Sequence, residues 1–344
     1  MKAAVIHAFG DADVLKVEDI PTPRPRPGHV LVKVLAAGVN RLEHYIREGS
    51  IVPELPFPHI LGADAVGEIA ELGDGVTGLA PGVRVVVVPG FPTNESDYGI
   101  TPAATAPSFA LPGLAIPGTY AQYVEVPARF VVADETGLDP AQAATLPMVL
   151  ATSVRAVKTV GQVKAGDHVL VQAGASGSGS MLIQVAKALG AKVAATIRTE
   201  DKRAFVEGLG ADPVINTGED DAVARVKAWT GGRGADVVVD NLGGDGFAQS
   251  IAAARPLGAV VAYGFAAGPE VRFDIRSLFF EQKQIRGTMA ADKDDLEWGL
   301  AQVKAGTIRP QLDRALPLDR AAEAHRLVAG NRVKGNVVLL PWAA

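Results

Sequence analysis

The amino-acid sequence predicts an α/β protein of two domains, one a doubly wound parallel sheet and the other mainly β. Its 344 residues are about twice the length of an average domain. The first third consists of β-branched runs between turns, whereas strands and helices alternate from about residue 150 onward. Such alternation is typical of a parallel sheet that is covered by helices on both faces.

The mainly-β part begins with apolar, β-branched segments. We expect strands over residues 30–36, 66–72 and 83–88. Pro-Gly pairs at 27–28 and 81–82 precede two of these strands and mark turns.

An uncharged stretch over residues 98–124 is long enough to cross a bilayer. It contains four evenly spread prolines, Pro102, Pro107, Pro112 and Pro117, which would break a membrane helix. We expect an irregular loop instead. The N-terminal apolar run is short and ends at Asp11, so no signal peptide is expected and the predicted location is cytoplasmic.

The second part alternates strands with helices. The expected strands are His168–Ala173, Lys192–Ile197, Pro213–Asn216, Asp236–Asp240, Gly258–Tyr263 and Gln284–Gly287. Helical patterns lie between most of them, at Ser180–Leu189, Glu200–Gly208 and Asp220–Trp229.

Composition excludes several kinds of site. The chain has no cysteine, which removes disulfides, thiolate nucleophiles, iron–sulfur clusters and Cys-ligated zinc. Its six histidines show no H-x-H or H-x-x-x-H spacing. The net charge of −5 argues against nucleic acid as a partner, because such binding depends on phosphate contacts.

A turn of small residues joins the first of the alternating strands to its helix. Gly174, Ser176 and Gly179 occupy the three positions of a G-x-G-x-x-G dinucleotide fingerprint, and Ala175, Gly177 and Ser178 complete the turn. Small side chains let a pyrophosphate approach the backbone amides at the helix N-terminus. An ordinary glycine-rich turn is the alternative, but the surrounding alternation of strands and helices favours dinucleotide binding.

The end of the second strand bears on which nicotinamide cofactor binds. An NAD site places Asp or Glu there, whereas this strand ends in Thr196 and Ile197, followed by Arg198 and Lys202. These cations suit a 2′-phosphate, so we expect NADPH in preference to NADH. The alternative is that both are solvated surface charges, offset by the acidic residues at 200–201.

Several segments in order resemble the medium-chain dehydrogenase/reductase superfamily over essentially the whole chain. They include AAGVNRLEHYIREG, LPFPHILGADAVGEIAELGDGV, GTYAQYVEVPA, ATLPMVLATSVRAV and KGNVVL. The resemblance implies a GroES-like catalytic domain over 1–149, completed by a return of the chain over 288–344, and a Rossmann domain over 150–287. It also implies further cofactor contacts, from Asn241, Gly243, Tyr263, Gly264, Phe265 and Lys334.

The positions that hold catalytic zinc in metal-dependent members of this superfamily differ here. Resemblance aligns them with Asn40, Ala63 and Met148, none of which binds Zn²⁺ tightly. The segment over about 89–117 matches the lobe that holds structural zinc, but it lacks cysteine. The chain therefore resembles the zinc-free quinone oxidoreductases, and we expect no metal.

Asn40, Tyr45 and Asp64 are the candidates for catalysis around the former metal position. Asn40 could hydrogen-bond a carbonyl oxygen and Tyr45 could donate a proton. Each also has a structural alternative. Asn40 and Glu43 match a capping box, Tyr45 could pack on the inner face of its helix, and Asp64 could be a structural hydrogen-bonding residue.

These observations favour an NADPH-dependent reductase of quinones or α,β-unsaturated carbonyls, since reducing an activated acceptor does not require a Lewis acid. The alternatives are a metal-independent alcohol or carbonyl dehydrogenase and a non-catalytic, NADPH-binding redox sensor. Resemblance also implies a homodimer through the sheet edge at Gln284–Gly287, because pairing would cover that edge in both subunits.

Overall fold

The computed structural model describes residues 1–343 and consists of two compact units. Unit 1 comprises residues 1–151, 290–304 and 310–343, and unit 2 comprises residues 152–289 and 305–309. The chain therefore leaves unit 1, builds unit 2 and returns. None of the helices within the described residues combines the length and apolar character needed to span a bilayer.

Unit 2 contains a six-stranded sheet whose neighbouring strands all pair in parallel. The strand order is β13-β12-β11-β14-β15-β16. The strands are β11 (His168–Val171), β12 (Lys192–Ile197), β13 (Val214–Asn216), β14 (Ala235–Asp240), β15 (Ala254–Ala262) and β16 (Gln284–Gly287). The order reverses between β11 and β14, as in doubly wound sheets, so this part of the predicted fold is confirmed.

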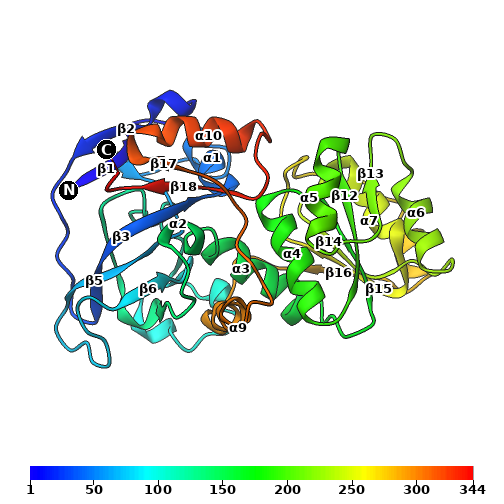
Figure 1. The fold of residues 1–344 in the computed structure, drawn as a ribbon, viewed down its shortest axis with the longest axis horizontal. Coiled ribbons are helices and arrows are strands. Elements are labelled where there is room, and N and C mark those ends of the chain that lie inside the picture. Colours follow the sequence, from blue (N-terminus) through cyan, green and yellow to red (C-terminus); the bar gives the residue numbers. More distant parts are fainter. Residues whose placement is uncertain (344) are drawn as a thin grey trace. The chain divides into compact units, whose positions relative to one another are not determined.

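Helices cover both faces of this sheet (Figure 1). They are α4 (Gly177–Ala188), α5 (Arg203–Gly208), α6 (Ala222–Trp229), α7 (Phe247–Ala253) and the short α8 (Arg276–Phe279). On one face, Leu170 and Val238 pack with Val226 of α6 and Ile251 of α7. Because successive strand residues point to opposite faces, their neighbours face α4 and α5.

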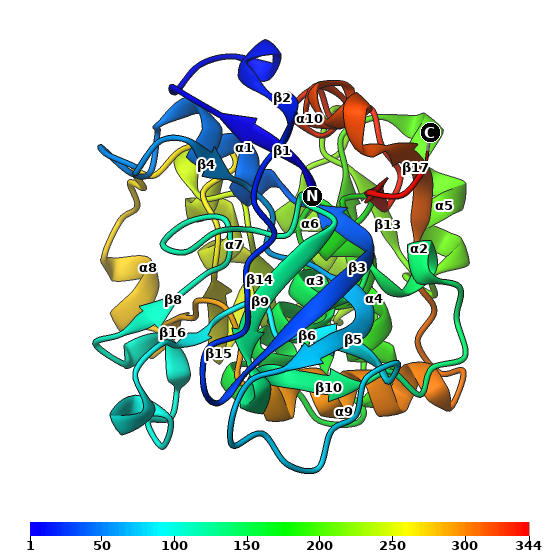
Figure 2. The same cartoon turned by 90° about the vertical axis from the view of Figure 1, so that its left-hand side faces the viewer.

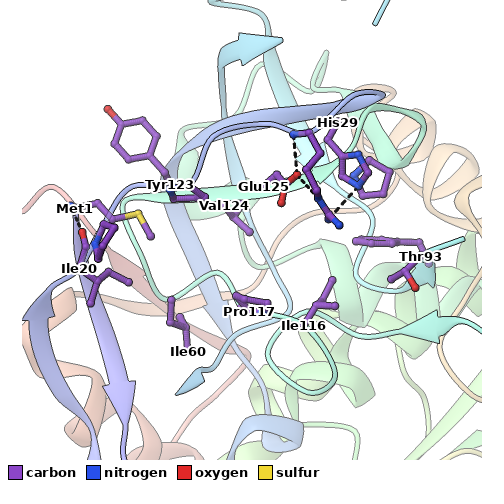
Figure 3. A pocket seen from close by; sticks show the side chains of 16 residues that line it. Met1, Ile20, His29, Ile60, Thr93, Ile116, Pro117, Tyr123, Val124 and Glu125 are labelled. Carbon is purple, nitrogen blue, oxygen red and sulfur yellow. Dashed lines mark hydrogen bonds and ion pairs between the residues drawn. The ribbon is translucent and has the colours of Figure 1, made fainter. Parts of the chain in front are cut away.

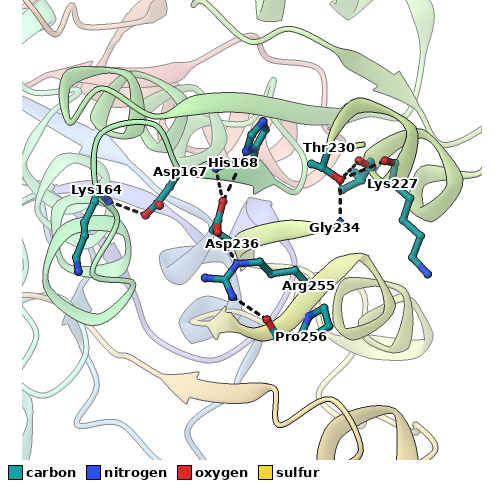
Figure 4. A network of polar contacts seen from close by, with 10 residues as sticks. Lys164, Asp167, His168, Lys227, Thr230, Gly234, Asp236, Arg255 and Pro256 are labelled. Atoms are coloured by element: carbon teal, nitrogen blue, oxygen red, sulfur yellow. Dashed lines mark hydrogen bonds and ion pairs between the residues drawn. The ribbon is translucent and has the colours of Figure 1, made fainter. Parts of the chain in front are cut away.

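A polar network joins the amino ends of the three strands β11, β14 and β15 (Figure 4). Asp236 accepts hydrogen bonds from the His168 amide at 2.7 Å and from Arg255 Nε at 2.5 Å. The His168 ring meets Trp229 edge-on, with 4.7 Å between ring centres. These contacts are structural, since they lie at the end of the sheet opposite to the one that binds ligands in such folds.

Unit 1 is mainly β, as the sequence predicts (Figure 2). Its seven-stranded sheet has the order β10-β6-β5-β3-β18-β17, and β9 also pairs with β3. The strands are β3 (His29–Val39), β5 (Val66–Leu72), β6 (Arg84–Val87), β9 (Tyr123–Pro127), β10 (Val131–Ala133), β17 (Leu312–Pro317) and β18 (Asn336–Leu340). A second sheet comprises β2 (Lys16–Asp19), β1 (Lys2–Ile6) and β4 (His59–Ile60).

The last strand of the chain completes the main sheet of unit 1. β18 pairs antiparallel with β3, with Val337 opposite Val39, and parallel with β17. The helices of this unit are α1 (Arg41–Glu48), α2 (Pro140–Ala143), α9 (Lys293–Lys304) and α10 (Ala321–Ala329), and α3 (Pro147–Val154) leads from unit 1 into unit 2.

The proline-rich segment over 98–124 is largely irregular, as predicted. Its strands are β8 (Phe109–Ala110), which pairs with β7 (Phe91–Pro92), and the first residues of β9.

Candidate active site

The turn between β11 and α4 is built for close approach of backbone atoms. A Cβ on Gly179 would lie 2.1 Å from the Ala173 carbonyl oxygen, and one on Gly174 would lie 2.9 Å from Ala195 Cβ. Ser176 is the N-cap of α4, and its Oγ accepts from the Gly179 amide at 3.0 Å and donates to the Ala173 carbonyl at 2.9 Å. The serine that departs from the fingerprint therefore caps the helix.

The first turn of α4 leaves amides for a ligand. The amides at the start of a helix have no partner within the helix, and here Ser176 satisfies the amide of Gly179. Those of Gly177 and Ser178 stand at the positive end of α4, beside the buried Ala175. This arrangement fits a pyrophosphate.

Thr196 lies beneath this turn. Its side chain is buried, and its Oγ1 accepts from the Ala173 amide at 2.9 Å and donates to Gln172 Oε1 at 2.8 Å. Gln172 in turn donates to Ser250 at 3.0 Å. Thr196 therefore links the second strand to the glycine turn, and its predicted cofactor contact stays a prediction.

The same polar chain continues to the end of β14. Ser250 donates to Asp240 Oδ2 at 2.5 Å, and Asp240 Oδ1 accepts from the Gly243 amide at 2.9 Å. Gly243 has φ +62°, and a Cβ there would lie 2.6 Å from the Gly268 carbonyl oxygen. Glycine is therefore required at this predicted cofactor position by both conformation and space.

Three of the predicted cofactor residues converge at the carboxyl edge of the sheet. Asn241 Nδ2 donates to Ser178 Oγ at 3.3 Å, and the buried Tyr263 hydroxyl lies beside both side chains. Burial raises the pKa of Tyr263, so the phenol is neutral. Gly264 approaches Asn241 closely, since a Cβ would lie 2.6 Å from the Asn241 carbonyl oxygen, and Phe265 is 38% exposed.

Arg198 follows β12 and is exposed. Glu200, the nearby acidic residue that could offset it, accepts from Arg203 Nη2 at 3.1 Å and from Asn216 Nδ2 at 3.4 Å. Arg203 therefore compensates the charge of Glu200. Lys202 is half-buried at the end of a 3₁₀ turn.

Lys334 belongs to unit 1. Its amide donates to Asp313 Oδ1 at 3.0 Å, and its side chain is exposed.

In unit 1, two buried carboxyl groups lie together beside the start of α1. Glu43 is fully buried and Asp64 is 1% exposed. Asn40 Nδ2 donates to Asp64 Oδ2 at 2.9 Å and lies 3.5 Å from Glu43 Oε1. We call Glu43 and Asp64 the acid pair. The structure therefore brings together the predicted Asn40 and Asp64 and adds Glu43.

Backbone amides complete the surroundings of the acid pair. The Ala63 amide donates to Glu43 Oε1 at 3.1 Å, and the Met148 amide donates to Asp64 Oδ1 at 2.7 Å. Burial and the charge of Asp64 raise the pKa of Glu43 to about 8, and burial raises the pKa of Asp64 to about 7. The pair therefore keeps a proton near neutral pH.

The three positions that the superfamily resemblance assigns to zinc ligands all contact the acid pair. Asn40 does so through its side chain, and Ala63 and Met148 through their amides. Among residues 1–343, no group of three or more His, Cys, Asp or Glu side chains is arranged to hold a metal ion. The groups at these three positions are amides that donate hydrogen bonds to the carboxyls, and amides do not bind Zn²⁺ tightly.

Glu43 was expected only as a helix cap. It does form the capping box, because its Oε2 accepts from the Asn40 amide at 2.8 Å. Its zero exposure and its contact with Ala63, twenty positions further on, show the second role. An acidic residue in the same segment as the presumed metal position was the only available signal.

Tyr45 lies further along α1 than the acid pair. It is half-buried, and burial raises the pKa of its phenol although Arg41, its hydrogen-bond partner, lowers it. Tyr45 is therefore a neutral hydrogen-bond donor.

Unit 1 also has a hollow of about 450 Å³, which does not include the acid pair or Tyr45 (Figure 3). It is mainly apolar, with Ile60, Ile116 and Tyr123 in its wall, and it has one ionic corner, where Arg26 Nε lies 2.8 Å from Glu125 Oε1. Asn40, Tyr45 and Asp64 are not part of its lining. This hollow is separate from the predicted catalytic residues.

Two family models match the chain. One describes the alcohol dehydrogenase GroES-like domain and matches residues 26–136, and the other describes zinc-binding dehydrogenases and matches residues 177–305. A 2-haloacrylate reductase from Burkholderia sp is 32% identical over 361 aligned residues, which cover 99% of each chain. The chain belongs to the medium-chain dehydrogenase/reductase family.

Other members of the medium-chain family are similar to this chain in sequence and in structure. The quinone oxidoreductase of Homo sapiens is 28% identical over 348 residues, covering 99% of this chain and 98% of that one. A crystal structure of an NAD-dependent alcohol dehydrogenase superposes with a TM-score of 0.92 at 36% identity, covering 99% of each chain. The GroES-like and Rossmann folds are thus confirmed, and this medium-chain protein is an NAD(P)H-dependent oxidoreductase.

Proposed function

We propose that this protein is a zinc-independent, NADPH-dependent reductase of quinones or α,β-unsaturated carbonyl compounds. The observation that carries the proposal is the acid pair, which bonds Asn40, Ala63 and Met148 where metal-dependent relatives have zinc ligands. Without a Lewis acid, alkoxide formation from a simple alcohol is poorly stabilised. The names of two relatives, 2-haloacrylate reductase and quinone oxidoreductase, point to activated acceptors of this kind.

We propose roles in catalysis for Asn40, Tyr45 and Asp64, of which Asp64 acts through Asn40 without touching the acceptor. Asn40 and Tyr45 are the partly exposed members and hydrogen-bond the acceptor, and Asp64 fixes the Asn40 side chain through the 2.9 Å contact. The bound nicotinamide supplies hydride to the acceptor. The protein supplies orientation and the proton.

The cofactor is held by unit 2 in this proposal. The amides of residues 174–179 bind the pyrophosphate, and Asn241, Gly243 and residues 263–265 line the nicotinamide side. Arg198 and Lys202 bind the 2′-phosphate, which favours NADPH, and Lys334 of unit 1 contributes a further contact. Arg198 suits this role because Arg203 already compensates Glu200.

We also propose a cytoplasmic homodimer whose domains are 1–149 with 288–344, and 150–287. Large apolar side chains are exposed on and near the edge strand β16: Phe280 is 72%, Met289 54%, Phe279 52% and Ile285 40% exposed. A second copy would cover them together with the open strand edge. Sedimentation showing a monomer of about 36 kDa at micromolar concentration would contradict the dimer.

Acceptor specificity tests the proposed function. Purified protein with NADPH is offered an ortho-quinone, a 2-haloacrylate, an enone and a simple aldehyde, and oxidation of NADPH is followed. Turnover of the first three at much higher kcat/KM than the aldehyde supports a reductase of activated acceptors. Efficient aldehyde reduction would favour the metal-independent dehydrogenase, an alternative that the alcohol dehydrogenase neighbour keeps open. Cofactor binding without any turnover would favour a redox sensor.

A further inference from the structure

Within residues 1–343, no cation makes a hydrogen bond or ion pair with the acid pair. In the described part of the chain, its four carboxyl oxygens accept from amide groups: the backbone amides of Asn40, Ala63 and Met148, and the side-chain amide of Asn40. Amide hydrogens stabilise a negative charge but do not neutralise it. Two adjacent carboxylates in a buried site repel each other strongly, so the pair favours a state with one proton between them.

The other titratable and charged groups nearby leave this charge unopposed. The Tyr120 hydroxyl is buried close to both carboxyls, and its raised pKa keeps it neutral. Beyond it, the His325 ring meets Tyr120 edge-on at 5.8 Å, and burial with the adjacent Arg47 lowers the pKa of His325 to about 3. Arg47 belongs to a separate cluster, in which its Nη2 donates to His44 and Glu48.

We propose that Glu43 and Asp64 hold a single proton between them and release it when the acceptor is reduced, so that they are the proton store of the active site. Asn40 is the one member of this trio with exposed surface, and it bridges the two carboxyls. The proton therefore leaves on the Asn40 side, by way of a water molecule.

The release of the proton rests on the proposed function, in which NADPH reduces the acceptor. The acceptor gains a hydride, that is one proton and two electrons, while NADPH is oxidised to NADP⁺. The resulting oxyanion takes the proton of the acid pair, whose charge changes from −1 to −2. A proton from solvent then restores the pair. Glu43 and Asp64 do not touch the acceptor, so they act through Asn40 and water as positioning and proton-holding residues.

Infrared spectroscopy of the full-length protein tests the stored proton without requiring turnover. A protonated buried carboxyl gives a carbonyl band that shifts in D₂O, and we expect one such band at about pH 7.5, between the pKa values of the two groups, that disappears by about pH 9. In Glu43→Gln or Asp64→Asn, the remaining carboxyl no longer meets a like charge, so its band disappears at lower pH. Glu71→Gln, at an exposed carboxyl on β5, is the matched control and leaves the band unchanged. Absence of the band, or an unchanged midpoint in both variants, overturns the proposal.

The pH profile of turnover tests the release of the proton. In the unmodified enzyme kcat falls as the acid pair ionises, whereas Glu43→Gln has a kcat about 100-fold lower, loses this dependence and changes KM little. A wild-type pH profile in Glu43→Gln overturns the role of the pair. If no acceptor is reduced at all, the proposed function fails, and the infrared result still decides whether the pair holds a proton. Circular dichroism confirms that each variant is folded.

Discussion

The glycine turn of unit 2 and the acid pair of unit 1 are assembled in opposite ways. The turn uses consecutive residues, 174–179, and presents backbone amides at a helix N-terminus. The acid pair combines Glu43 of α1 with Asp64 and is held by the side chain of Asn40 and the amide of Met148, 84 positions beyond Asp64. A site made from one segment is visible in sequence spacing, whereas a site made from several segments requires the fold.

The two sites also differ in charge. Helix amides attract an anion, and the glycines let it come close. The acid pair does the reverse, since it concentrates negative charge in a buried place and retains a proton as a result. The four predictions below test this contrast, from the largest expected effect to the smallest.

Substitution within the glycine turn has the largest expected effect. In Gly179→Ala the new Cβ meets the Ala173 carbonyl oxygen at 2.1 Å, so the turn must open. We expect a loss of about 3 kcal/mol in the free energy of unfolding and at least tenfold weaker binding of either cofactor. Denaturant titration and fluorescence titration with NADPH measure the two effects. Gly208→Ala on α5, where a Cβ meets nothing within 4 Å, is the control, and similar losses in both variants would contradict the prediction.

Cofactor preference depends on one charge beside the turn. NADPH is expected to bind more tightly than NADH, and Arg198→Ala is expected to reduce the ratio of the two dissociation constants by about 10- to 100-fold, because one charge-assisted contact to phosphate contributes about 1.5–3 kcal/mol. Arg225→Ala, an exposed arginine on α6, should leave the ratio unchanged. Equal dissociation constants in the unmodified protein would show that the 2′-phosphate is not recognised.

The free energy of unfolding should fall between about pH 6.5 and 8, because the acid pair loses its protons in this range. The pKa values of about 8 and 7 in the folded state exceed the ordinary 4.5 and 3.8, so the folded state binds more protons in this window. The free energy of unfolding therefore falls as pH rises, by about 1.4 kcal/mol per pH unit for one proton. The acid pair keeps this slope down to about pH 4.5, and below about pH 6.5 His325 opposes it in part, because His325 binds a proton only on unfolding.

Denaturant titrations across that window measure the slope. Glu43→Gln should flatten it, and Glu71→Gln should retain it. Stability that rises with pH over the same range in the unmodified protein would show that the pair is ionised in the folded state.

Metal removal should have no effect. Purified protein is expected to contain far less than one zinc per chain, and chelators should leave turnover intact, because Asn40, Ala63 and Met148 supply no metal-binding side chain set. Elemental analysis provides the measurement. About one zinc per chain, lost together with activity on chelation, would contradict this prediction and the contrast between the two sites.

Regular elements could be predicted wherever the local pattern was complete. The strands at 192–197 and 284–287 occur with the predicted bounds. Glycine or charged residues at or next to their ends mark where each strand begins and stops. The predicted helix at 180–189 begins earlier, at Gly177, because Ser176 caps it. The pattern of apolar residues does not reveal a cap formed by a serine inside a glycine-rich turn.

The candidate site could be predicted only in part. Asn40 and Asp64 were found because they occupy positions of a known motif, and the structure joins them. Glu43 was missed as part of the site, because its burial and its proximity to Asp64, which is distant in the sequence, depend on tertiary structure. Thr196 was found from its place at the end of β12, and its cofactor contact stays a prediction, but the hydrogen bonds of its hydroxyl to Ala173 and Gln172 could not be predicted from the sequence.

Because the chain returns to β3 only at its end, the two units can complete their folding at different times during synthesis on the ribosome. Unit 2 has all six strands once residue 287 has emerged, so its sheet can form during synthesis. Residues 37–39 of β3, by contrast, can pair only after Val337–Leu339 of β18 have been synthesised. Until then β3 carries an open edge next to buried apolar residues, a template for pairing with another nascent chain. Premature termination between β17 and β18 therefore yields a chain with a complete sheet in unit 2 and an aggregation-prone unit 1.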